Sequence, residues 1–189
     1  MNDTLPDYKI ARNDFQKIVD SLNLKFETSS ATAVVEGESV FLKYTATING
    51  NSFDYSMGIG HINWDKVDPE KSYIGVCAGM SVEEESFIRT YKRKNYCKFR
   101  EVKLWAKVCE KVANKLKTAP TLVDVLSCVL MDASALDWTF EDWCSEFGYD
   151  EDSRSAEKTY NACCDNARRV KKFLKREDME KLTDLANQL

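Results

Sequence analysis

Residues 120–174 read PTLVDVLSCVLMDASALDWTFEDWCSEFGYDEDSRSAEKTYNACCDNARRVKKFL, and this stretch decides the fold. It contains three helix-start signals in series. Thr121 with Asp124, and Thr139 with Asp142, each have the spacing of a capping box, in which a hydroxyl and a carboxylate satisfy free backbone N–H groups at the helix start. An acidic run ending in serine supplies a third N-cap. The stretch therefore predicts three consecutive helices.

Apolar side chains recur at helical spacing after each start. The first predicted helix has a strongly apolar face made of Leu122, Val125, Leu126, Val129 and Leu130. The second predicted helix is short, and Gly148 is a natural stop for it. Three aromatic residues are its expected apolar anchors: Phe140, Trp143 and Phe147.

The third predicted helix is the longest, at roughly twenty residues. A final helix is expected around residues 178–189. The third helix has a seam of residues separated by three or four positions, which we expect to be buried: Ala156, Tyr160, Cys163, Ala167, Val170 and Leu174.

The N-terminal third of the chain predicts a helix beside a small antiparallel sheet. Apolar side chains at helical spacing favour a helix over residues 8–22. Residues 40–48, VFLKYTATI, alternate between apolar and polar side chains, which is typical of a half-buried strand. Asn49-Gly50 is the dipeptide best suited to a two-residue hairpin turn. The return strand, residues 52–58, alternates again, so about three strands are expected.

Two glycines follow the return strand in Gly58-Ile59-Gly60-His61. Glycines after a strand occur in phosphate-binding loops, but the third glycine and the Lys-Ser/Thr pair of such loops are missing. We therefore expect the glycines to let the chain leave the sheet, and we expect a structural role for His61.

Residues 89–117 are the most basic part of the chain. Eleven Lys and Arg stand against two Glu, a net charge of +9, whereas the whole chain carries −4 and the remaining residues −13. Aromatic residues are interleaved with cations in the first half, which suits a nucleic acid or an acidic partner. The candidate binding residues are Arg89, Tyr91, Lys92, Arg93, Lys94, Tyr96, Lys98, Arg100 and Lys103.

The second half of this basic segment also has a simpler interpretation. Lysines recur every four residues opposite a row of apolar residues, which is the pattern of an amphipathic helix with a solvated basic face. These lysines are Lys103, Lys107, Lys111 and Lys115. Another short helix is expected upstream, over residues 82–89. A functional basic surface and a solvated face both remain open.

Carboxylates gather between residues 137 and 152, and the sequence leaves their role open. Paired carboxylates can carry hydrolysis or hold a metal, but each of these also suits a helix N-terminus or a solvated face. As an acidic surface they would suit a basic partner, including a nucleic-acid-binding protein. The carboxylates are Asp137, Glu141, Asp142, Glu146, Asp150, Glu151 and Asp152.

Cysteine usage and hydropathy point to a protein of a reducing compartment. Seven cysteines, an odd number without a secretion signal, indicate free thiols, and the single histidine leaves no usual Cys/His zinc set. Residues 1–10 contain no apolar run that would form a signal peptide. No stretch approaches the roughly 18 apolar residues of a membrane span. We expect no metal, no cofactor and no membrane partner.

Two blocks of the chain, residues 10–62 and 119–175, carry a recognisable pattern. It consists of an N-terminal helix, a strand ending in a Met-Gly-x-Gly-His turn, a Pro-Thr helix start, and a Phe-Glu-x-Trp…Gly-Tyr-Asp-x-Asp-Ser-Arg block. The matching residues are Met57, Gly58, Gly60, His61, Pro120, Thr121, Asp124, Phe140, Glu141, Trp143, Gly148, Tyr149, Asp150, Asp152, Ser153, Arg154 and Tyr160. This pattern resembles a family of small phage and prophage proteins of largely uncharacterised function. Relative to that family, residues 62–117 are a basic insertion.

The resemblance implies a phage or prophage origin and a place in the host cytoplasm, and it implies no catalytic residues. We expect an accessory protein that binds a host protein or ribonucleoprotein complex and acts by binding rather than by catalysis. An anti-CRISPR-like inhibitor of host defence is one such protein. The alternative is direct binding of DNA or RNA through residues 89–117.

The expected fold class is α+β, with an N-terminal helix, a small antiparallel sheet and a mainly helical C-terminal part. The expected division is a helix with a β-meander over residues 1–62, a basic and mainly helical insertion over residues 63–118, and a helical part over residues 119–189. The three parts are expected to form one compact domain.

Overall fold

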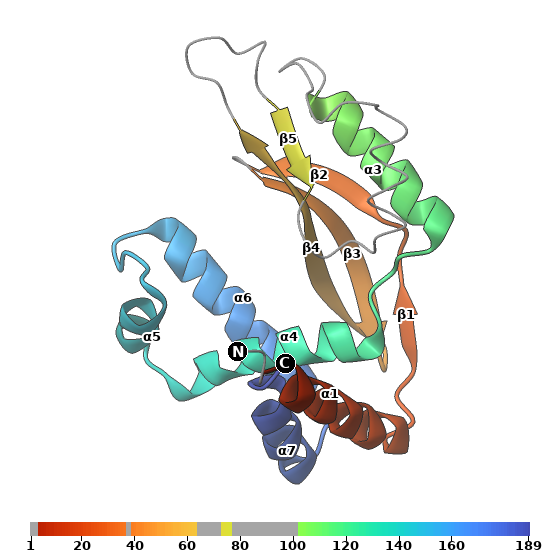
Figure 1. Ribbon diagram of the computed structural model, residues 1–189. Helices are drawn as coiled ribbons and strands as arrows, with labels where there is room; N and C mark the ends of the chain where they lie inside the picture. Colours follow the sequence, from red (N-terminus) through yellow and green to blue (C-terminus); the bar gives the residue numbers. More distant parts are fainter. Residues whose placement is uncertain (1–3, 37–38, 64–72, 77–101) are drawn as a thin grey trace. The chain divides into compact units, whose positions relative to one another are not determined.

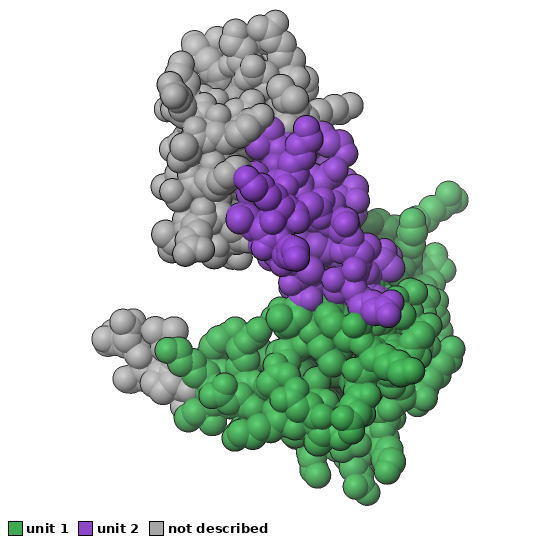
Figure 2. All heavy atoms as spheres, turned by 90° about the vertical axis from the view of Figure 1, so that its right-hand side faces the viewer, with its two compact units in different colours: residues 1–26, 47–53, 121–189 green, residues 27–46, 54–120 purple. Residues whose placement is uncertain are grey.

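The computed structural model describes residues 4–36, 39–63, 73–76 and 102–189. It confirms the α+β class: an N-terminal helix is followed by a small antiparallel sheet and then by a mainly helical part (Figure 1). The chain divides into two compact units, which Figure 2 colours separately. Unit 1 contains residues 1–26, 47–53 and 121–189, and unit 2 contains residues 27–46 and 54–120. The three-part division expected from the sequence stays a prediction.

The sheet is built around one long hairpin. Strand β3 pairs with β4, β5 lies beyond β4, and both β1 and β2 pair with β3. The pairing of β2 with β3 is antiparallel, as is that of β5 with β4. The strands are β1 (Phe26–Thr28), β2 (Thr32–Glu36), β3 (Ser39–Ile48), β4 (Asn51–Asn63) and β5 (Tyr73–Val76).

The predicted hairpin is confirmed in detail. The even-numbered side chains of β3, from Val40 to Ile48, are all buried, while the odd-numbered ones are partly or fully exposed. Asn49 and Gly50 both have positive φ, 47° and 78°. This is the backbone that a two-residue turn needs to match the twist of its strands.

One expectation about the strands is wrong, and one strand was not expected. Strand β4 does not end at Gly58 but continues to Asn63, because β5 pairs with its last residues and extends the sheet. The ring of Phe41 lies against Gly58, so a neighbouring side chain covers this glycine within the strand. Strand β2 was not expected, because the stretch TAVVE does not alternate and all three of its apolar residues are half-buried.

In unit 2 the helix α3 (Val102–Leu116) packs on the sheet. Its buried residues include Cys109, Val112 and Ala113, which join Leu42 and Ile59 of the strands in one apolar cluster. The predicted amphipathic helix is therefore confirmed. Its described apolar face lies against β-strand side chains, and Lys107, Lys111 and Lys115 are exposed.

Side chains of α3 also satisfy the backbone beside strand β2. The Asn114 carboxamide accepts a hydrogen bond from Ala31 N at 2.8 Å and donates one to Ala31 O at 3.1 Å. The Glu110 carboxylate accepts from Ala33 N at 2.9 Å. An edge strand carries backbone groups without a strand partner, and such groups invite pairing with another chain. Helix α3 thus protects this edge.

Replacing Asn114 with alanine is expected to cost roughly 1–2 kcal/mol of stability, because both backbone groups of Ala31 lose their partner. Amide hydrogen exchange should show faster exchange at Ala31 than in the native protein. The neighbouring substitution Lys115→Ala, on the same turn of α3, is the control and should leave that amide unchanged. Unchanged exchange at Ala31 in the Asn114 variant would contradict the assignment.

Unit 1 is a cluster of helices. Helix α4 contacts α1, α6 and α7, and the core beneath it contains Phe15, Leu126, Leu130 and Leu182, each 0% exposed. The helices are α1 (Thr4–Ser21), α4 (Leu122–Ala133), α5 (Phe140–Phe147), α6 (Arg154–Val170) and α7 (Arg176–Ala186), with a short 3₁₀ helix η3 (Ser134–Asp137) after α4. All five α-helices were expected, although α6 ends at Val170 rather than near Leu174.

The predicted capping of α5 and α6 is confirmed. The Thr139 hydroxyl accepts from Asp142 N at 3.1 Å and donates to the Asp142 carboxylate at 2.8 Å. Ser153 caps α6 by accepting from Ser155 N at 3.3 Å. Gly148 ends α5 with φ 71°, a conformation that glycine adopts without steric cost.

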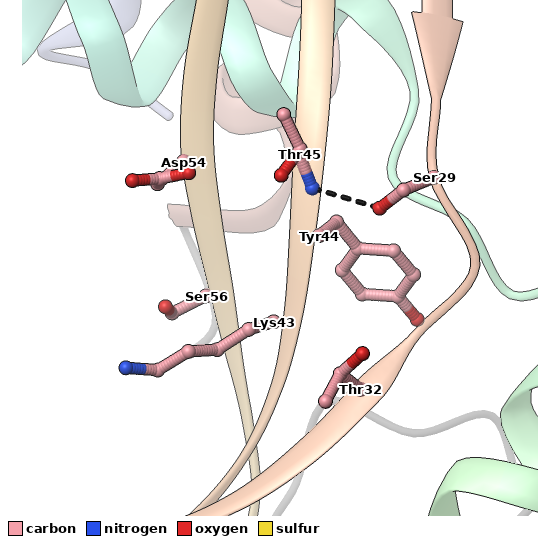
Figure 3. A pocket seen from close by; sticks show the side chains of 7 residues that line it. All are labelled: Ser29, Thr32, Lys43, Tyr44, Thr45, Asp54 and Ser56. Carbon is pink, nitrogen blue, oxygen red and sulfur yellow. Dashed lines mark hydrogen bonds between the residues drawn. The ribbon is translucent and has the colours of Figure 1, made fainter.

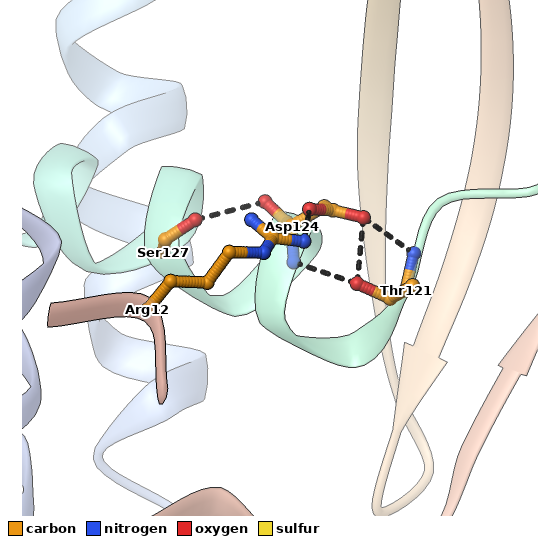
Figure 4. A network of polar contacts seen from close by, with 4 residues as sticks. All are labelled: Arg12, Thr121, Asp124 and Ser127. Carbon is orange, nitrogen blue, oxygen red and sulfur yellow. Dashed lines mark hydrogen bonds and ion pairs between the residues drawn. The ribbon is translucent and has the colours of Figure 1, made fainter. Parts of the chain in front are cut away.

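The first capping box does more than start α4. One Asp124 carboxylate oxygen accepts from Thr121 N at 2.8 Å and from the Thr121 hydroxyl at 2.6 Å. The other accepts from the Arg12 guanidinium of α1 at 2.7 Å (Figure 4). Burial alone would raise the pKa of Asp124, but the hydrogen bonds from Thr121 and Arg12 outweigh it and lower that pKa. The network joins α1 to the start of α4.

The tip of the β-hairpin also belongs to unit 1. The rings of Phe53 and Phe173 meet edge to face at 6.3 Å, and the Arg169 guanidinium donates to Ser52 O at 2.8 Å. The end of α6 therefore holds the start of β4.

Candidate binding surfaces

Eight of the nine candidate binding residues lie outside the described residues. These are Arg89, Tyr91, Lys92, Arg93, Lys94, Tyr96, Lys98 and Arg100. The ninth, Lys103, belongs to the first turn of α3, and its side chain is also outside the described set. The expected short helix over residues 82–89 also lies outside the described residues. These sites stay predictions.

The described part of the basic segment forms an exposed lysine face on α3. Lys107, Lys111 and Lys115 are all exposed, as is Lys117 just beyond the end of the helix, whereas Ala106, Cys109, Val112 and Ala113 on the other side are at most 4% exposed. Lys107 pairs with Glu110 at 2.9 Å, and that same carboxylate accepts from Ala33 N. The pKa of Glu110 is lowered, chiefly by the Lys107 hydrogen bond. Lys107 thus supports the contact between Glu110 and strand β2, and the other lysines keep this face of α3 basic.

A hollow of about 270 Å³ lies over the sheet in unit 2 (Figure 3). Some of its polar groups have partners within or beside the sheet. Thr45 N donates to the Ser29 hydroxyl at 2.9 Å, which replaces a backbone acceptor where the chain passes from β1 to β2. The Lys43 ammonium pairs with Glu36. The hollow is lined by Ser29, Thr32, Lys43, Tyr44, Thr45, Asp54 and Ser56. We assign no ligand to it.

Unit 1 contains an aromatic cluster around α5. The buried Trp143 lies 4% exposed and stacks on Tyr149, with 4.7 Å between centroids and 15° between planes. Phe147 and Tyr160 lie 5.4 and 5.5 Å from the Trp143 ring. The Tyr160 hydroxyl donates to Trp138 O at 2.8 Å, which ties α6 to the start of α5.

One expected anchor of α5 is not buried. Phe147 is 53% exposed, and Tyr149 and Trp138 are 43% and 40% exposed. The expectation that Phe147 is a core residue is therefore wrong. The helix is only eight residues long, and its inner face reaches the core at Trp143 and Cys144 but not at the last turn. The helical spacing of aromatic residues could not show where the core ends.

The carboxylates expected in this region lie around the same helix. Asp137, Glu141, Asp142, Glu146, Asp150, Glu151 and Asp152 are all exposed. None of them forms an ion pair with another residue that the structure describes. Asp142 serves the cap of α5, and the Asp150 carboxylate accepts from Asp152 N at 3.1 Å. The structure thus places an acidic rim beside exposed aromatic rings.

A polar cluster between α4 and α6 contains Asp132, Asn166 and the Cys163 thiol. The Asn166 amide donates to Asp132 at 3.1 Å. Burial raises the pKa of Asp132, and burial together with the Asp132 charge raises the pKa of Cys163 to about 12. A thiol with so high a pKa is a poor nucleophile at neutral pH. Five cysteines of the described residues form no disulfide bond: Cys109, Cys128, Cys144, Cys163 and Cys164.

No three His, Cys, Asp or Glu side chains in the described ranges are arranged to share a metal ion. None of the described helices combines the length and apolarity needed to cross a membrane. Comparison of the chain with protein-family models, with curated proteins and with solved structures finds no match. The resemblance to phage proteins therefore stays a prediction.

Proposed function

We propose that this protein is a phage-encoded accessory protein that binds a macromolecule of its host and acts by binding rather than by catalysis. One observation carries the proposal: on two of the described helices the exposed charge is of one sign, and the sign differs between them. Helix α3 of unit 2 presents lysines, and α5 of unit 1 presents carboxylates beside exposed aromatic rings. Such one-sign faces steer charged partners and exclude partners of the same sign.

The resemblance to phage proteins supports a location in the host cytoplasm. It also supports a more specific version of the proposed function. In that form the partner is a host protein or ribonucleoprotein complex of a defence system, and the protein is an anti-CRISPR-like inhibitor. The basic segment, residues 89–117, is its added recognition surface.

The test is capture from a bacterial host lysate with the full-length protein, followed by identification of protein and nucleic acid and by reconstitution from purified components. We expect a saturable complex. Reversing Arg93, Lys94, Lys98 and Arg100 to glutamate should weaken it by at least tenfold, since each charge contact to a partner contributes about 0.2–1 kcal/mol or more. Reversal of Lys9 and Lys181, exposed lysines on α1 and α7, is the control and should leave the complex unchanged. A native protein that forms no reconstituted complex would refute the proposal.

A second candidate function is direct binding of DNA or RNA through the same segment. The observation that favours it is the lysine face of α3, where exposed cations recur at each helical turn. Purified protein should then bind a duplex or single strand with an affinity that falls steeply with salt. Binding that survives nuclease treatment of the lysate, with no affinity for the purified nucleic acid at about 50 mM salt, would exclude it.

A further inference from the structure

Residues 146–152, EFGYDED, are seven consecutive exposed residues at the C-terminal end of α5. Four are carboxylates and two are aromatic, and we call this run the α5 terminal surface. Phe147 is 53% and Tyr149 43% exposed. Both rings contact Trp143, so they belong to one exposed aromatic patch, and a patch of this kind with a polar rim is a feature of interaction sites.

Both rings are supported by Trp143, whose ring centroid lies 5.4 Å from that of Phe147. Tyr149 stacks on Trp143, which is itself buried in a cluster with Cys144, Ala156 and others. Tyr149 N donates to Cys144 O at 2.9 Å, so a hydrogen bond to α5 also fixes the backbone of Tyr149. One face of the Tyr149 ring is covered by Trp143. Rings positioned before binding lose little conformational entropy when a partner arrives.

The charged residues next to the rings in sequence are acidic. Glu146, Asp150, Glu151 and Asp152 flank Phe147 and Tyr149, and no Lys or Arg occurs between residues 118 and 153, although Arg154 follows at the start of α6. The carbonyl end of α5 adds partial negative charge at the same place. A nucleic acid would be repelled here, whereas a cation would be attracted.

The guanidinium group of arginine can contact the aromatic rings and the carboxylates at the same time. It is planar and stacks on an aromatic ring, and its fork of N–H donors pairs with a carboxylate in two parallel hydrogen bonds. An ammonium group is a point charge and makes only part of this contact. We propose that the α5 terminal surface docks an arginine-rich segment of a protein partner. This inference rests on the proposed function and specifies the partner of the acidic face.

The test uses a short fluorescent peptide in which arginine alternates with serine, and the full-length protein. Anisotropy should show saturable binding, and the same peptide with lysine in place of arginine should bind several-fold more weakly. Phe147→Ser together with Tyr149→Ser should weaken arginine-peptide binding about tenfold, because each cation–π contact contributes about 0.5–1 kcal/mol at exposed sites. Serine at Ile10 and Met131, two other side chains more than half exposed, is the matched control and should have no effect.

A second pair of variants keeps the rings. Glu146→Gln with Glu151→Gln should weaken peptide binding to a similar extent and flatten its salt dependence. Glu27→Gln with Glu177→Gln removes the same charge from exposed glutamates elsewhere and should not. Equal melting temperatures for the two glutamine pairs will separate lost binding from lost folding.

The possible outcomes are distinct. Equal binding of arginine and lysine peptides, or equal loss in both glutamine pairs, would show a nonspecific charge effect and overturn the inference. Self-association of the native protein that Glu146→Gln and Glu151→Gln abolish, without peptide binding, would assign the surface to a second copy and also overturn it. If host-partner capture persists in the Phe147 and Tyr149 variant while the peptide fails to bind, this inference fails and the proposed function stands.

Discussion

Replacing Leu126 with alanine is expected to lower the free energy of unfolding by about 3–5 kcal/mol. The side chain is 0% exposed in the middle of α4, the helix that contacts α1, α6 and α7 in unit 1. Truncation removes apolar surface from the core and leaves a cavity, because a close-packed interior collapses only in part around the missing atoms.

Met131, on the same helix but 53% exposed, provides the control. Its replacement with alanine should cost less than about 1 kcal/mol, as is usual for surface positions. Urea unfolding followed by circular dichroism measures both variants, and the denaturant dependence should be shared so that midpoints compare directly. Similar midpoints for the Leu126 and Met131 variants would show that α4 does not form the centre of this core.

Much of the fold was predictable because its signals are local. The capping pairs at Thr121 and Thr139 and the glycine at position 148 are sequence-adjacent groups that serve one helix end. Strand β3 was predictable because the sheet buries only one of its faces, which leaves a clean alternation. Such features need no knowledge of what lies across the core.

The features that sequence reasoning missed depend on distant partners. Asn114 holds the backbone of Ala31 from 83 positions along the chain, and nothing in the pattern of α3 distinguishes it from a solvated residue. Strand β2 shows no alternation, since none of its three apolar residues is fully buried. Phe147 has the spacing of a core residue but lies beyond the end of the core. The candidate site was predicted only in part for the same reason. Its charges can be identified from the sequence, whereas the exposure of its aromatic rings depends on where the core ends.

The second large effect concerns Asp124. Replacing it with alanine is expected to cost about 2–3 kcal/mol, because α4 loses its capping box and the Arg12 guanidinium loses its acceptor. Arg12→Ala alone should cost less, about 0.5–1 kcal/mol, since that side chain is 38% exposed and its charge is screened by solvent.

The double variant tests whether the contact between α1 and α4 contributes to the free energy of unfolding. If the two residues act through the 2.7 Å ion pair, the cost of the double variant should fall short of the sum of the single costs by roughly 0.5–1 kcal/mol. Asp14→Ala and Lys17→Ala, which form an exposed pair of the same length within α1, serve as the control cycle and should be additive to within about 0.3–0.5 kcal/mol. Strict additivity at Arg12 and Asp124 would mean that the two side chains lie close together without stabilising the contact between these helices.

The same network predicts a pH dependence with a definite sign. The folded-state pKa of Asp124 is lowered relative to an unfolded carboxyl, so the folded protein binds its proton less readily than the unfolded chain does. Its contribution is fully present above the unfolded pKa, about 3.9, and is lost as pH falls through the folded value. The stability difference between the native protein and Asp124→Asn should therefore be constant from neutral pH down to about pH 5 and shrink below it. Asp132, whose pKa is raised by burial, changes in the opposite direction but is present in both proteins and cancels in the difference. Urea midpoints measured across this range test the sign directly, and a difference that grows on acidification would contradict the lowered pKa.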